Sequence, residues 1–177
     1  MIRFKQIIYL VLISISTASW SQDNKELIRQ YDAYVKSINE DSTLIMIDFD
    51  GNKYLNPELK KLGKQELYGF YKNGQLVKIR ARRDIGSAHG EKLYYLRNDS
   101  LIFVHNISEF QKYDYNTMSL SPDELEIGSE GFNYFKNDKI IYYKRTGFDF
   151  ANENLTDEQR EKNYTRDIYQ LKQIMKK

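Results

Sequence analysis

The segment Tyr71-Lys72-Asn73-Gly74-Gln75-Leu76-Val77 decides the fold, because its pattern occurs three times in the chain. The other two copies are LRNDSLI at residues 96–102 and FKNDKII at residues 135–141. Each copy has an apolar or aromatic residue, a basic residue, Asn followed by Gly or Asp, one further residue and two apolar residues. Asn-Gly and Asn-Asp tolerate the positive φ angles of tight hairpin turns. The repeated pattern therefore predicts three consecutive β-hairpins.

The segments on either side of these turns are rich in aromatic and β-branched residues, which favour strands. A further strand is predicted at residues 43–49. Together the segments predict an antiparallel meander of about six to eight strands. We expect loops at Asp84–Gly90 and Phe110–Gly131, and residues 121–124 (Ser-Pro-Asp-Glu) suggest one turn of helix in the longer loop.

Two amphipathic helices are predicted outside the meander. Residues 25–38 carry apolar side chains at helical intervals, and so do residues 157–175. A capping-box spacing precedes each of them, the second at Thr156 and Gln159. The fold class that follows is a single α+β domain, in which the C-terminal helix packs on the sheet.

The first 21 residues have the layout of a secretory signal peptide. Arg3 and Lys5 form a basic start, residues 7–15 form an apolar run, and small residues surround Trp20. The run is shorter than the roughly 20 apolar residues of a spanning helix. We therefore expect residues 1–21 to be removed and residues 22–177 to form one exported domain, periplasmic or extracellular, without a transmembrane segment.

The charge balance of the expected mature chain argues against nucleic acid as a partner. The whole chain has 27 Lys and Arg against 25 Asp and Glu. Removal of Arg3 and Lys5 leaves 25 against 25, so no basic excess remains for nucleic acid or an anionic membrane. The chain has no cysteine, which excludes disulfides and thiolate metal sites. The expected partner is a protein or a glycan of unknown identity.

The segments YKNGQLVKI, YLRNDSLIFV and YFKNDKIIYY resemble the hairpins of MORN-like repeat proteins. Gly74 is the one glycine of these segments at a comparable turn. The order of signal peptide, helix, tyrosine-rich meander and C-terminal helix also resembles small exported proteins of Bacteroidota. The resemblance implies an exported domain of β-hairpin repeats, and it transfers no activity and no functional residue.

Residues 47–52 (Ile-Asp-Phe-Asp-Gly-Asn) have three interpretations. They resemble the first motif of haloacid-dehalogenase-type phosphatases, in which Asp48 would be the nucleophile and Asp50 the general acid/base beside Mg²⁺. Asp48, Asp50 and Asn52 also have the spacing of the first ligands of a calcium loop, although the later Gly and Glu of an EF-hand are missing. The third interpretation is a strand that ends in an Asp-Gly turn. No cofactor other than Ca²⁺ or Mg²⁺ is suggested.

Lys78, Arg80 and Arg82 alternate with apolar residues, and Arg83 extends the run. Alternation places the first three on one strand face. That basic face would suit an anionic glycan or a carboxylate partner. The alternative, which we favour, is a solvated face balanced by acidic residues of the neighbouring strand, such as Glu91.

Tyrosine is abundant, with 15 in the chain. Tyr94 and Tyr95 are adjacent, as are Tyr142 and Tyr143, so each pair should place one ring on each face of the sheet. Tyrosine has a flat apolar ring and a polar tip, which suits binding surfaces as well as half-buried sheets. The other use for these rings is packing of both faces by the two helices.

The function expected from these observations is an exported, non-enzymatic binding or protein-interaction module. Its candidate binding residues are the basic strand Lys78, Arg80 and Arg82 and the two tyrosine pairs. One alternative is a metal-assisted phosphoester hydrolase centred on Asp48 and Asp50. Another is a small-ligand carrier, if the sheet closes around a cavity.

Overall fold

The computed structural model describes residues 23–51, 63–147 and 155–175. The chain divides between Glu40 and Asp41 into two compact units, which we describe separately. In the first unit, residues 23–39 form an α-helix, so the predicted N-terminal helix is confirmed. The predicted signal peptide lies outside the described residues. In the described part of the chain, no helix has the length and apolar character needed to cross a membrane.

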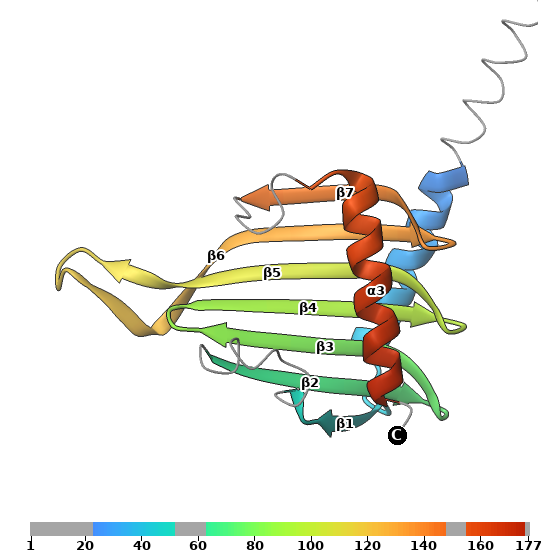
Figure 1. Cartoon of the computed structure of the whole chain (residues 1–177), viewed down its shortest axis with the longest axis horizontal. Coiled ribbons are helices and arrows are strands. Elements are labelled where there is room, and N and C mark those ends of the chain that lie inside the picture. Colours follow the sequence, from blue (N-terminus) through green and yellow to red (C-terminus); the bar gives the residue numbers. More distant parts are fainter. Residues whose placement is uncertain (1–22, 52–62, 148–154, 176–177) are drawn as a thin grey trace, which may run out of the picture. The chain divides into compact units, whose positions relative to one another are not determined.

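The second unit contains a seven-stranded antiparallel sheet whose strands follow one another in sequence order (Figure 1). The strands are β1 (Ile45–Phe49), β2 (Gly63–Lys72), β3 (Gln75–Ile85), β4 (Ala88–Arg97), β5 (Ser100–Asp114), β6 (Ser119–Lys136) and β7 (Lys139–Gly147). This arrangement confirms the predicted α+β class and the antiparallel meander.

The three repeated segments form the three predicted hairpins. Both central residues of each turn have positive φ, as in type I′ turns: 50° and 77° at Asn73–Gly74, and 52° and 62° at both Asn98–Asp99 and Asn137–Asp138. The register shifts by one residue at the same place in every copy, because Val77, Ile102 and Ile141 have no ladder partner within their own hairpin. The second apolar residue of each copy is therefore a bulge residue.

The two predicted loops are wrong. Asp84–Gly90 contains only a two-residue turn at Gly86–Ser87, which joins β3 to β4 in a fourth hairpin. Phe110–Gly131 consists mainly of β5 and β6, which meet at a turn over residues 115–118. Residues 121–124 lie within β6 and form no helical turn. Leu120 pairs with Tyr113 of β5 and Leu125 pairs with Gln111, whereas residues 121–124 have no ladder partner on β5. A proline within this stretch therefore interrupts no ladder hydrogen bond.

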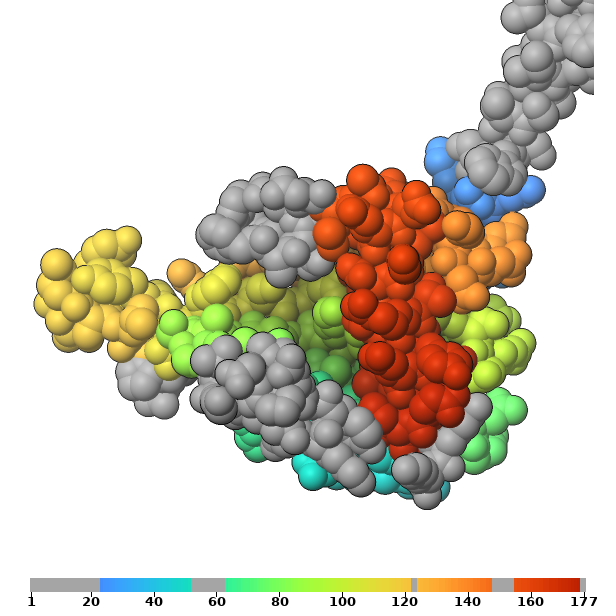
Figure 2. All heavy atoms as spheres, in the orientation of Figure 1, coloured from blue at the N-terminus to red at the C-terminus, as the bar shows by residue number. Residues whose placement is uncertain are grey.

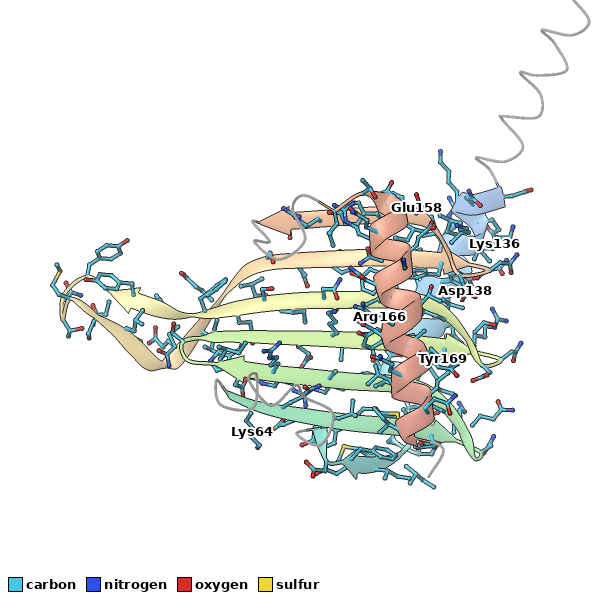
Figure 3. All side chains as sticks on the ribbon, in the orientation of Figure 1. Lys64, Lys136, Asp138, Glu158, Arg166 and Tyr169 are labelled. Carbon is cyan, nitrogen blue, oxygen red and sulfur yellow. The ribbon has the colours of Figure 1, made fainter. Side chains whose placement is uncertain are left out.

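Helix α3 (Asp157–Met175) crosses one face of the sheet, which we call the α3 face (Figure 1). The helix begins at the predicted capping box. Thr156 Oγ1 accepts a hydrogen bond from the backbone N–H of Gln159 at 3.2 Å, and Gln159 Oε1 accepts one from the backbone N–H of Thr156 at 2.8 Å. Figure 3 shows Glu158, Arg166 and Tyr169 on the outer side of α3, and Tyr169 is 64% exposed.

The inner side of α3 forms the hydrophobic core with the sheet. Tyr164, Ile168 and Met175 of α3 are buried. The strand residues in the same core are Leu67, Ile79, Tyr94, Leu96, Leu101, Val104 and Phe135. Each fully buried apolar side chain contributes about 1.5–3 kcal/mol to the stability of the fold. The predicted packing of the C-terminal helix on the sheet is thus confirmed.

Candidate ligand-binding cavity

A cavity of about 510 Å³ lies between α3 and the sheet. Strands β3 to β7 supply most of its floor, and Arg160, Tyr164, Asp167 and Leu171 of α3 line the side. Figure 2 shows the sheet hollowed beside α3, with the green strands at the bottom of the recess. The hydrophobic core and the cavity therefore share one face of the sheet.

The register of the strands explains why the floor is hollow. Gly131 of β6 is paired with Asn106 of β5 on one side and with Arg145 of β7 on the other. Because side chains alternate along a strand, all three positions face α3. The neighbouring row of the floor contains Gly90, Ser108 and Ser129. Short or missing side chains in two adjacent rows leave the space that the ligand cavity occupies.

The backbone conformation at residue 131 does not require glycine. A Cβ atom added there would lie 3.6 Å from Asn106 Nδ2 and 3.9 Å from Asn133 Nδ2, which is ordinary contact. Its φ is not in the left-handed region. A larger side chain at this position would therefore extend into the cavity without straining the strand.

Three buried polar atoms of the cavity lining have no hydrogen-bond partner among the described residues. They are Arg83 Nε, Asn106 Oδ1 and Asn133 Oδ1. Asn133 is only 1% exposed, and its Nδ2 donates to the Val104 carbonyl at 3.5 Å. The Asn106 amide donates to the Tyr164 hydroxyl at 2.6 Å. An unmet buried polar group costs about 1–3 kcal/mol, so these three atoms favour a hydrogen-bond partner other than the described residues.

The charges around the cavity are unbalanced in favour of cations. Lys92 lies 3.3 Å from Asp167, and Arg160 lies 2.9 Å from Asp157. Among the described residues, by contrast, no carboxylate pairs with Arg83 or Arg145. A guanidinium is always charged in proteins and cannot relieve burial by losing a proton. The cavity is thus suited to an anionic group.

Aromatic rings complete the lining. Tyr94 of β4 is buried, and its hydroxyl lies 3.5 Å from Asp167 Oδ2. Burial, together with the negative charge of Asp167, raises the pKa of Tyr94 well above its ordinary value, so its hydroxyl stays protonated at neutral pH. The Tyr143 ring stacks under the Arg160 guanidinium, 4.7 Å from the ring centroid.

The basic strand predicted as a binding face lies on the opposite side of the sheet from α3. Its charges have internal partners, as the favoured alternative expected. Arg80 Nε lies 2.6 Å from a carboxylate oxygen of Glu91 on β4. Arg82 Nε lies 3.1 Å from Asp84 Oδ1. The Lys78 ammonium lies 5.3 Å from the ring centroids of Phe70 and Tyr95, and burial lowers its pKa.

The two tyrosine pairs place one ring on each face, as predicted. Tyr94 and Tyr143 lie on the α3 face and line the cavity. Tyr95 and Tyr142 point to the opposite face, where Tyr142 is 44% exposed. The pairs therefore contribute one ring each to the cavity and one ring each to the opposite face.

The predicted acidic site lies at the end of β1, an edge strand of the sheet, with Asp48 on the strand and Asp50 directly after it. Asp48 and Asp50 are both exposed, and Asn52 lies outside the described residues. Within the described part of the chain, no group of three His, Asp or Glu residues is arranged to hold a metal ion. The structure brings neither carboxylate to the cavity.

Sequence reasoning missed most of the residues that make the cavity. Asn106, Asn133 and Arg145 are not among the predicted binding residues, Arg83 is predicted only as the extension of the basic run, and Gly131 ends a predicted loop. One signal was available. Asn106 and Asn133 stand two residues from the apolar residues Val104 and Phe135, so a polar side chain shares a strand face with the core. Which of these polar residues meet depends on the register between strands.

Comparisons with known proteins do not identify the chain. No family model, no curated protein and no solved structure matches it. The similarity to MORN-like repeats and to exported proteins of Bacteroidota therefore stays a prediction. What the cavity binds has to be argued from its own residues.

Proposed function

We propose that this protein is an exported, non-enzymatic binding module that holds a small organic ligand in the cavity between α3 and the sheet. The observation that carries the proposal is the cavity itself. It measures about 510 Å³, and three buried polar atoms in its lining have no partner among the described residues. Ligand pockets commonly measure about 300–1,000 Å³ and combine apolar walls with a few oriented polar groups.

The size of the cavity favours an organic molecule over a single bridging water. A water molecule occupies about 30 Å³ in the liquid, far less than this space. The walls supply the aromatic rings of Tyr94 and Tyr143 and the aliphatic side chains of Leu171 and Ile174. A ligand with both an apolar and a polar part would satisfy this lining better than solvent.

The carrier alternative assumed that the sheet would close around a cavity. The described strands form an open sheet in which β1 and β7 are the two edges. Helix α3 lines one side of the cavity from outside the sheet, so a partly enclosed site is available without a barrel. The exposed edge position of Asp48 and Asp50 offers no comparable enclosure for the hydrolase alternative.

Native mass spectrometry of the protein purified from its own host tests the proposal. Gly131→Phe fills the floor of the cavity, and Thr146→Phe adds the same ring on the opposite, exposed face of β7. We expect the wild type and Thr146→Phe to retain a small-molecule mass that Gly131→Phe lacks. A wild-type mass without any small-molecule adduct, or the same adduct on all three proteins, would refute binding in the cavity. Urea denaturation checks that both variants remain folded.

Export is the second part of the proposal and is supported by the layout of residues 1–21. The full chain with a C-terminal epitope tag is expressed in its host and fractionated. We expect a shortened protein outside the cytoplasm. Leu10→Arg interrupts the apolar run and should leave full-length protein in the cytoplasm, whereas Leu10→Ile should be exported normally. Cytoplasmic, uncut wild-type protein would contradict this part alone.

A further inference from the structure

We propose that the cavity binds an organic acid that also carries hydroxyl or N–H donors, with the carboxylate at Arg145 and a donor group at Asn133. This inference rests on the proposed function and names the chemical class of its ligand. Arg145, Asn106 and Asn133 surround Gly131 on the floor of the cavity, and we call these four residues the Gly131 subsite.

Arg145 provides the anion-binding group of the subsite. Its strand position faces α3, and it lines the cavity. The arginines on β3 that point to the opposite face have carboxylates at 2.6 and 3.1 Å, whereas Arg145 pairs with no carboxylate of the described residues. A guanidinium presents parallel N–H donors that match the two oxygens of a carboxylate. Its charge and geometry therefore select an organic anion.

Asn133 requires a donor from the ligand. The Val104 carbonyl can only accept a hydrogen bond, so the amide end that faces it at 3.5 Å must be the NH₂ group. The free end is then Oδ1, which is buried and has no partner among the described residues. A carboxylate at neutral pH has no hydrogen to donate. The ligand must therefore carry a hydroxyl or N–H group in addition to its acid group.

The strand register places Arg145 and Asn133 at neighbouring positions on the α3 face. Arg145 is paired with Gly131, and Asn133 is the next residue of β6 on the same face. Diagonal neighbours on adjacent strands lie about 7–8 Å apart. The space between them is open because Gly131 has no side chain. A small ligand that carries both an acid group and a donor group, such as a hydroxy acid, can therefore contact both residues.

Arg160 strengthens the preference for an anion. It lines the same cavity and stacks on Tyr143, which is two residues from Arg145 on the same face of β7. Arg160 also pairs with Asp157 at 2.9 Å, and the Asp157 side chain is 77% exposed. Two guanidinium groups on one side of a partly enclosed space raise the local concentration of anions.

Two sets of three compounds test separately the contribution of the ligand's negative charge and that of its hydroxyl donor to binding. Mandelate is compared with mandelamide, which lacks the charge, and with phenylacetate, which lacks the hydroxyl. Lactate, lactamide and propionate form the smaller set. Dissociation constants are measured by saturation-transfer NMR on the full chain and on Arg145→Gln, Arg145→Lys, Arg83→Gln and Gly131→Phe.

We expect the hydroxy acid to bind the wild type about tenfold or more tightly than either analogue, because the amide lacks the charge for Arg145 and the acid without a hydroxyl leaves Asn133 Oδ1 unpaired. Arg145→Gln should remove the preference for acid over amide, Arg145→Lys should keep part of it, and Gly131→Phe should abolish binding. The difference in affinity between mandelate and phenylacetate for the wild-type protein tests the role of Asn133 without a substitution in the core.

Equal binding of acid and amide, an unchanged preference in Arg145→Gln, or a larger effect of Arg83→Gln would overturn this inference. So would binding by none of the acids. Each of these results leaves the proposed function standing if native mass spectrometry shows a ligand that depends on the cavity. A bare wild-type protein in that experiment removes both.

Discussion

The Asn106 amide on β5 donates a hydrogen bond of 2.6 Å to the Tyr164 hydroxyl on α3. This bond joins strand β5 to the helix above it, and both residues line the cavity. The same contact therefore fixes the height of α3 over the floor and orients one amide of the proposed ligand site. Because Tyr164 also packs edge-on against Phe135, 5.6 Å between ring centroids, its ring is held by the core.

Tyr164→Phe keeps the ring and removes the hydroxyl. The Asn106 amide then loses its partner, and we expect the free energy of unfolding to fall by about 1–2 kcal/mol, measured by urea denaturation. Asn106→Leu removes the other side of the bond. The double variant should lose less than the sum of the two single variants, and strict additivity would show that the bond has no energetic role.

Ile168→Ala should destabilise the protein strongly, because Ile168 is 6% exposed within the core between α3 and the sheet. Truncation of a buried Ile costs about 2–5 kcal/mol through lost contacts and the cavity left behind. Tyr169→Ala is the matched control on the outer side of the helix and should change stability by less than about 0.5 kcal/mol. Similar urea midpoints for the two variants would mean that α3 does not pack as described.

Asp138 is the second central residue of the β6–β7 turn and has a φ of 62°. Asp138→Val should cost about 1–2 kcal/mol, because a β-branched residue is disfavoured in the left-handed region. Asp138→Gly adopts this φ without strain, so its stability should remain within about 0.5 kcal/mol of the wild type. If both substitutions had the same effect in thermal unfolding, the turn conformation would not be the cause.

Asp41 has a pKa of about 2, lowered mainly by its hydrogen bond with Lys72 and then by bonds from Thr43. The Lys72 ammonium lies 2.7 Å from its carboxylate. Because the folded-state pKa is below the ordinary value of 3.8, this pair stabilises the fold above pH 4 and loses its effect as the pH falls toward 2.

We expect Lys72→Met to raise the pKa of Asp41 toward 3.8, measured by carboxyl NMR titration. Lys64→Met is the control, because Lys64 pairs with Glu66 at 2.8 Å and not with Asp41. Should the pKa of Asp41 stay near 2 in Lys72→Met, the bonds from Thr43 alone would account for the shift.

Local sequence determined the elements of this fold, because hairpin turns and helix caps depend on residues that are neighbours in the chain. The dipeptides Asn73–Gly74, Asn98–Asp99 and Asn137–Asp138 adopt positive φ wherever the strands on either side pair. The capping box at Thr156 and Gln159 likewise forms within one helical turn. The loops predicted at Asp84–Gly90 and Phe110–Gly131 are hairpins as well, because Ile85 pairs with Ala88 and Asp114 with Ser119 across short turns that lack the Asn-Gly or Asn-Asp pattern.

Only the tertiary structure decided where a ligand site lies. Arg82 and Arg83 are adjacent in the basic run, yet Arg82 pairs with Asp84 on one face and Arg83 lines the cavity on the other. Gly131 meets Asn106 and Arg145 because two strand registers place them in one row. Nothing in the spacing of these residues encodes that row, and the cavity exists because α3 packs over it. The sequence alone determined the turns, the strands and the helices, while register and helix docking assembled the cavity from residues far apart in the chain.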